Sequence, residues 1–87
     1  MSQPGIVSGY PLVLLTRPDC GLCEDMLAGL AAFGERDHLP PLAQLDVDSD
    51  PELMRRYGLK IPVLLLDGAL VCSQQLDADE LRRLLRR

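Results

Sequence analysis

Short apolar blocks separated by Gly, Pro and Asp divide the chain, and their spacing predicts four strands and three helices. The block 11–16, PLVLLT, is apolar almost throughout, which is typical of a strand buried on both faces of a sheet. From Cys20 onward apolar residues recur at helical spacing, with Asp19 as the expected N-cap and Gly34 as the expected end. Apolar and polar residues then alternate over 42–48, which predicts a second strand.

The next segments predict a short helix and a hairpin. Asp50-Pro51 suits a helix start, because Asp caps the N-terminus and the missing N–H of Pro costs nothing at the first helical position. Gly58 is the expected end of this helix. Asp67-Gly68 separates the apolar runs 63–66 and 69–72, and this dipeptide favours a type I′ turn, in which both central residues need positive φ.

A capping box predicts the last helix, since Asp77 is followed three residues later by Glu80 before an apolar face. The element order is therefore βαβαββα, an α/β fold. A right-handed crossover makes the first two strands parallel, and the hairpin adds two antiparallel strands. We expect a central mixed four-stranded sheet with helices on both faces, in a single domain over 1–87 with a flexible lead over 1–10.

Two cysteines, Cys20 and Cys23, stand where the first strand gives way to the first helix. Helical positions three apart lie roughly 5 to 6 Å from each other, which suits the Cα separation of a disulfide, about 4.4 to 6.8 Å. The helix N-terminus and Arg17 favour a thiolate at Cys20, and we expect them to outweigh three nearby carboxylates that can turn toward water. Our hypothesis is that Cys20 is the nucleophile with a depressed pKa, while the less exposed Cys23 resolves the mixed disulfide.

The same cysteines allow other interpretations. They are compatible with a reduced, buried pair that serves as small apolar residues. They are also compatible with zinc, for which His38 and Cys72 are the remaining soft or imidazole ligands. His38 lies in a polar stretch and is expected to be a solvated loop residue. Cys72 is expected to be a buried small residue of the fourth strand, with a regulatory or extra catalytic thiol as the alternative.

The order of elements, the Cys-x-x-Cys junction and Ile61-Pro62 at the start of the third strand together resemble the thioredoxin fold. The likeness covers residues 11–85 and is greatest for small glutaredoxin-like proteins with a Cys-x-Leu-Cys site. It implies that Pro62 is cis and packs beside the dithiol, and that the backbone of Ile61 pairs with an extended substrate. Lys60 would assist Arg17 in attracting an acidic substrate or a glutathione carboxylate, or it is a solvated loop lysine.

The resemblance implies a thiol-disulfide oxidoreductase or electron carrier that exchanges disulfides with a protein or a small thiol. It requires no prosthetic group, and glutathione is a candidate co-substrate. Two departures weigh against glutathione: Gly21-Leu22 replaces the usual Pro-Tyr, and the stretch 71–75, VCSQQ, replaces a Gly-Gly pair. The alternative is a glutathione-assisted iron–sulfur or metal-binding module that uses the same cysteines, formed in the cluster case between two copies.

The composition of the chain restricts the classes of partner that we expect. Thirteen acidic and nine basic residues give a net charge of −4, and aromatics are 3% of the chain, so a nucleic-acid partner is not expected. Apolar runs are too short to cross a membrane, and the first residues do not resemble a signal peptide. We therefore expect a cytoplasmic monomer, in whose reducing compartment a Cys-x-x-Cys favours redox or metal chemistry. The arginines at 82–83 and 86–87 complement a helix dipole or meet an acidic partner.

Overall fold

A four-stranded sheet in the order β2-β1-β3-β4 forms the centre of the computed structural model, which describes residues 5–86. The first two strands are parallel, whereas β1 pairs with β3 and β3 with β4 in antiparallel fashion. The predicted α/β fold and mixed sheet are confirmed. In chain order the elements are β1 (Leu12–Thr16), α1 (Gly21–Arg36), β2 (Leu42–Asp46), the 3₁₀ turn η1 (Val47–Ser49), α2 (Pro51–Tyr57), β3 (Val63–Leu66), β4 (Ala69–Ser73) and α3 (Ala78–Leu85).

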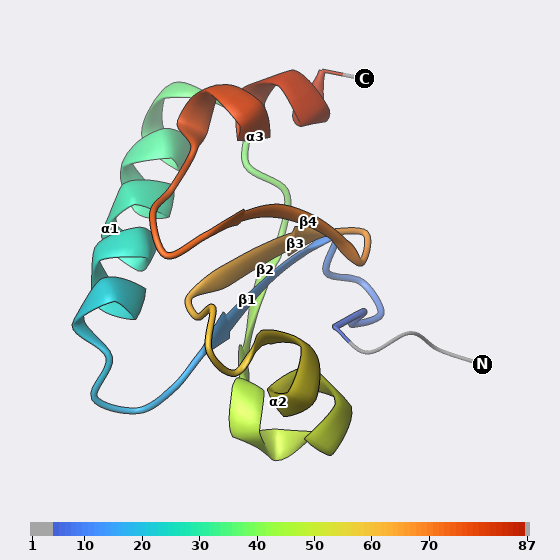
Figure 1. Ribbon diagram of the computed structural model, residues 1–87. Coiled ribbons are helices and arrows are strands. Elements are labelled where there is room, and N and C mark those ends of the chain that lie inside the picture. Colours follow the sequence, from blue (N-terminus) through green and yellow to red (C-terminus); the bar gives the residue numbers. More distant parts are fainter. Residues whose placement is uncertain (1–4, 87) are drawn as a thin grey trace.

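Helices cover both faces of the sheet, with α1 and α3 on one side and α2 on the other (Figure 1). The alternation within β1 explains the two layers. Leu12 and Leu14 pack toward α1 and α3, and Val13 and Leu15 pack toward η1 and α2. All four side chains are at most 1% exposed, so the strand is buried on both faces, as its unbroken apolar run predicts.

The limits of α1 differ from those predicted. Asp19 is not the N-cap: the cap is Cys20, and Asp19 instead has φ +57 in the turn before the helix. An Asp tolerates this left-handed conformation better than most residues. Gly34 does not end the helix either, because α1 continues to Arg36 and is capped by Asp37, whose N–H donates to the Phe33 carbonyl at 2.8 Å.

The shorter elements follow their local signals more closely. Asp50 caps α2 by accepting the N–H of Glu52 at 2.7 Å, and Gly58 follows its last residue. Asp67 and Gly68 have φ of 51 and 86, as the predicted type I′ turn requires. Strand β2 is shorter than predicted, however, since its last two predicted residues belong to η1.

The pairing of β3 with β4 contains one irregularity. Leu64 pairs with Cys72 and Leu65 with Leu70, so Val71 is the extra residue of a β-bulge. Val71 remains buried, whereas Leu70 is 54% exposed on the edge strand. The extra residue therefore contributes its side chain to the core, although it has no partner on β3.

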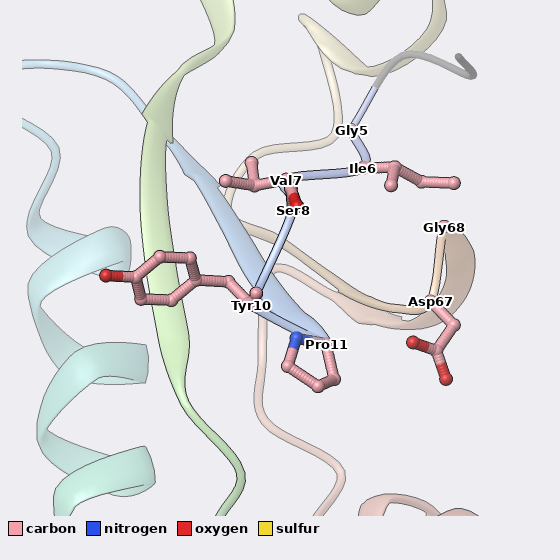
Figure 2. Close-up of a pocket in the computed structure, with 9 residues that line it drawn as sticks. Gly5, Ile6, Val7, Ser8, Tyr10, Pro11, Asp67 and Gly68 are labelled. Atoms are coloured by element: carbon pink, nitrogen blue, oxygen red, sulfur yellow. The ribbon is translucent and has the colours of Figure 1, made fainter. Parts of the chain in front are cut away.

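The lead predicted over 1–10 is described from residue 5 onward, and 1–4 lie outside the described residues. Gly5 is buried, with φ +86, and the N–H of Tyr10 donates to the Val7 carbonyl at 3.0 Å. This segment and the β3–β4 turn line an open hollow of about 320 Å³, and Figure 2 shows the side chains of Ile6 and Tyr10 pointing in opposite directions. Within 5–86, no helix combines the length and the hydropathy needed to cross a membrane.

Gly34, inside α1, and Gly58, directly after α2, should respond in opposite ways to replacement by alanine. Gly34 lies inside α1, and an added Cβ would meet Leu39 at ordinary contact distances of 3.6 to 3.7 Å. Gly34→Ala should therefore raise the free energy of unfolding by about 0.5–1 kcal/mol. A Cβ at Gly58 would lie 2.5 Å from the Met54 carbonyl oxygen, so Gly58→Ala should lower it by about 1–3 kcal/mol. Urea unfolding of both variants measures the difference, and a destabilised Gly34→Ala would contradict the continuous helix.

Candidate active site

The strand registers bring three loops to one end of the sheet. Thr16, the last residue of β1, lies opposite Asp46, the last residue of β2. Leu15 lies opposite Val63, the first residue of β3, so Pro62 precedes β3 beside the end of β1. The dithiol loop, the β2–η1 junction and the Ile61-Pro62 segment therefore converge, although they are distant in sequence.

Cys20 and Cys23 form a disulfide at the N-terminus of α1, with their Cα atoms 5.2 Å apart. Cys20 is the N-cap, and its Sγ accepts the backbone N–H of Cys23 at 3.1 Å. An N-terminal amide that points at sulfur stabilises negative charge there, in addition to the positive end of the helix dipole. Cys23 is 3% exposed, whereas Cys20 is only partly buried. The greater burial of Cys23 agrees with the prediction.

A cavity of about 330 Å³ lies beside both cysteines, between the start of α1 and the outer strand β2. Its charged lining residues are Arg17 and the carboxylates of Asp19, Glu24 and Asp46. All three carboxylates belong to exposed residues. The wall beside the dithiol is therefore more negative than positive.

Arg17 is held by groups from two other elements. Its Nε and Nη2 donate to the two carboxylate oxygens of Asp48 in η1, at 2.8 and 3.0 Å. Its Nη1 donates to the carbonyl of Gly58 at the end of α2, at 3.2 Å. The hydrogen bond from Arg17 holds the pKa of Asp48 below its usual range, although burial opposes this shift. The guanidinium of Arg17 thus makes a bidentate ion pair with the carboxylate of Asp48.

The other predicted substrate-binding residues lie just before β3. The Ile61-Pro62 peptide bond is cis, as the resemblance implies, and Pro62 is buried. Its carbonyl accepts the N–H of Gln74 at 2.7 Å, which ties the segment to the end of β4. Ile61 is half-buried against the layer that contains α2, and Lys60 is exposed.

Cys72 and His38 lie apart from this site. His38 follows the C-terminus of α1, and a 16-residue helix separates it from Cys20 by roughly 24 Å at 1.5 Å per residue. Cys72 lies in β4, half-buried, beside a hollow of about 500 Å³ at the start of α3. Over residues 5–86, no three His, Cys, Asp or Glu side chains form a cluster suited to a metal ion. The four-ligand zinc set that the sequence left open as an alternative is therefore not assembled among these residues.

Sequence reasoning did not identify Asp48 or the carbonyl of Gly58 as parts of this region. Asp48 was assigned to the end of a strand, and it lies 31 positions from Arg17. Gly58 lies 41 positions from Arg17 and contributes a backbone oxygen, which has no residue signature. Neither contact has a local sequence signal, because both depend on the strand registers that bring the loops together.

A mixed sheet with this order and a disulfide at the first strand–helix junction define a thioredoxin-fold protein with a dithiol site. Residues 11–86 match the model of the Glutaredoxin-like domain (DUF836), and the chain belongs to this family. No curated protein matches the chain significantly.

Solved structures agree with this assignment. Protein Ne2328 from Nitrosomonas europaea is 28% identical, with 97% of this chain and 98% of that chain covered and a TM-score of 0.76. Protein XcR50 from X. campestris is 31% identical over 86% of this chain and 95% of that one, with a TM-score of 0.66. The holo form of glutaredoxin C1 from Populus tremula x tremuloides shares the fold at 14% identity, covering 87% and 71% of the two chains, with a TM-score of 0.58.

Cys72 should react slowly in the folded protein. Burial raises the pKa of its thiol, and nearby Asp77 has a mixed influence through its backbone and its charge. In the oxidised protein Cys20 and Cys23 are bonded, so Cys72 is the free cysteine. Iodoacetamide should label it more slowly than in urea, and the rate in the folded protein should still rise with pH above about 8.5, where an ordinary thiol approaches its plateau. Labelling as fast in the folded protein as in urea would contradict the slow reaction expected of Cys72. The Cys72→Ser variant measures the background labelling.

Proposed function

We propose that the protein is a thiol-disulfide oxidoreductase or electron carrier that works through Cys20 and Cys23. The observation that carries the proposal is the N–H of Cys23 donating to Cys20 Sγ at the helix N-terminus. The same turn that brings the two sulfurs together also favours the anion that attacks a disulfide. The family assignment and the shared fold support the same chemistry.

The reaction consists of two exchanges. The Cys20 thiolate attacks one sulfur of a substrate disulfide, forms a mixed disulfide and releases the other substrate sulfur as a thiolate that takes a proton from water. Cys23 then loses its proton and attacks Cys20 Sγ, which releases the second substrate thiol and closes the Cys20–Cys23 disulfide. The substrate gains two electrons and the protein loses two. A second thiol couple restores the dithiol, and the relative reduction potentials set the direction.

The unequal exposure of the two sulfurs supports the order of these steps. An incoming disulfide meets the partly exposed Cys20 before it meets Cys23, which is 3% exposed. Cys23 lies one turn into the helix, where it reaches only a group already attached to Cys20. The buried thiol therefore has access to the mixed disulfide and limited access to solvent oxidants.

Exposed apolar side chains near the site favour a protein disulfide as the partner. Leu22, between the cysteines, is 49% exposed, and Leu59, three residues before Pro62, is 97% exposed. Large apolar residues left in water beside a reactive group are typical of a surface that receives another chain. An extended substrate segment would pair with the backbone of Ile61, as the resemblance implies.

Glutathione is the less favoured co-substrate under this proposal. Its two carboxylates would approach a cavity already lined by Asp19, Glu24 and Asp46. Arg17, the cation expected to receive them, is engaged by Asp48 and Gly58. Lys60 remains as an exposed cation for this purpose. A cytoplasmic location, where thiols are kept reduced, fits a dithiol that turns over.

Single cysteine variants test the mechanism. Cys23→Ser should hold a stable mixed disulfide with a small disulfide or a peptide disulfide, because the resolving thiol is absent. Cys20→Ser should capture far less, since its remaining active-site thiol is buried. Mass spectrometry under nondenaturing conditions measures both adducts, with Cys72→Ser as the background in each case. Equal capture by the two variants would overturn the assignment. Cysteine-dependent visible absorbance after anaerobic purification would instead favour the iron–sulfur alternative.

The charge of a small disulfide should alter its rate. The reduced protein should react faster with cationic cystamine than with anionic glutathione disulfide, and the ratio should fall as salt increases, because the screening length decreases from about 30 Å at 0.01 M to about 3 Å at 1 M. Asp46→Asn and Glu24→Gln should each reduce the ratio at low salt. Stopped-flow measurement of both rate constants checks this, and a ratio insensitive to salt would show that the carboxylates do not select the substrate.

A further inference from the structure

Arg17 connects the two sides of the dithiol site. It belongs to the loop that leads from β1 to Cys20, and three of its nitrogens donate to Asp48 and Gly58. Gly58 lies four positions before Pro62, in the segment that leads into β3. The guanidinium therefore bridges the loop that carries the nucleophile and the segment proposed to receive the substrate.

The Gly58 end of this bridge is firmly placed. Gly58 is buried, its N–H donates to the Met54 carbonyl at 2.9 Å, and the close approach to this oxygen leaves no room for a Cβ. The N–H of Lys60 donates to the Tyr57 carbonyl at 2.8 Å, which fixes the turn that follows. A hydrogen bond to the Gly58 carbonyl consequently acts on a short, ordered segment that ends at Pro62.

The Asp48 end is also ordered. The backbone N–H of Asp48 donates to the Asp46 carboxylate at 2.9 Å, and the Ser49 hydroxyl donates to the Asp46 carbonyl at 2.6 Å. These bonds hold η1 directly after β2, whose register with β1 is fixed. Asp48 thus presents both carboxylate oxygens from a defined position, which is the geometry that a guanidinium fork requires and an ammonium does not.

These contacts weigh against Arg17 as a substrate-binding cation. Nε, Nη1 and Nη2 all have partners within the protein, and both Asp48 and Asp46 act on its charge. A substrate carboxylate would have to compete with the carboxylate of Asp48, which already makes a bidentate pair with Arg17. The sequence-based expectation that Arg17 attracts an acidic substrate is therefore replaced by a different role.

We infer that Arg17 is a positioning residue. Its bidentate pair with Asp48 and its hydrogen bond to the Gly58 carbonyl connect the two sides of the site. They thereby hold Cys20 at the correct distance from a substrate disulfide that lies along Ile61-Pro62. The inference rests on the proposed function. A small disulfide needs only the Cys20 sulfur, whereas a disulfide within an extended peptide must contact both sides of the site at once. Loss of the bridge should therefore slow the peptide reaction more than the small-molecule reaction.

Variants that lose the bidentate pair provide the sharpest test, and of the two used here Arg17→Lys also keeps its charge. For Arg17→Lys and for Asp48→Asn, the expected result is a fall of about tenfold in the ratio of the peptide rate constant to that of hydroxyethyl disulfide, a size typical of lost orientation. The side chains of Arg17 and Asp48 are 37% and 42% exposed, and exposed pairs add little to global stability, so these variants should fold. Circular dichroism and thermal melting confirm folding.

A matched control and a rescue separate positioning from general damage. Arg83→Lys removes a similar exposed bidentate pair on α3, where Nε and Nη2 donate to Glu80 at 2.7 and 2.8 Å, and should leave the ratio unchanged. The double variant Arg17→Asp/Asp48→Arg should have a higher ratio of peptide to hydroxyethyl disulfide rate constants than Arg17→Asp alone, because it restores the charge pair. An unchanged ratio in Arg17→Lys, or an equal fall with both substrates, would overturn the inference. Wild-type protein that reacts with neither substrate would instead refute the proposed function.

Discussion

The burial of β1 is the constraint on which the rest of the structure depends. Four consecutive aliphatic side chains, from Leu12 to Leu15, are removed from water, and full burial of each such side chain contributes about 1.5–3 kcal/mol. A strand covered on both faces cannot slip by one residue without exchanging its two layers. Because β2 and β3 take their registers from β1, its end at Thr16 determines where the three loops of the site meet.

The chemical inequality of the two cysteines follows from their places in one helical turn. Cys20 lies outside the helix proper, where its sulfur takes the place of the usual capping oxygen and accepts an amide that has no partner within the helix. Cys23 already belongs to the helix, and its side chain is buried with the sheet. A three-residue spacing therefore places one sulfur at the protein surface and the other beneath it, and no further side chain is needed to distinguish them.

Local signals predicted most of the fold and part of the site. Asp50-Pro51, Asp67-Gly68 and the apolar run of β1 specify their structures within a few residues, so these elements were predicted correctly. The cap of α1 was not, because residue preferences favour Asp, whereas here an Asp occupies the turn and a sulfur serves as the cap. The bridge from Arg17 to Asp48 joins positions that only the assembled sheet brings together, and the β4 bulge similarly depends on how β4 packs against β3.

The bulge at Val71 has a consequence for self-association. The outermost strands of an open sheet expose unpaired backbone groups on which another strand can add, and this is a common route to aggregation. In β4 the extra residue interrupts the regular ladder, and in β2 the exposed residues Gln44 and Asp46 place polar groups along the opposite border. Both borders of the sheet thus disfavour uncontrolled addition of a strand from another molecule.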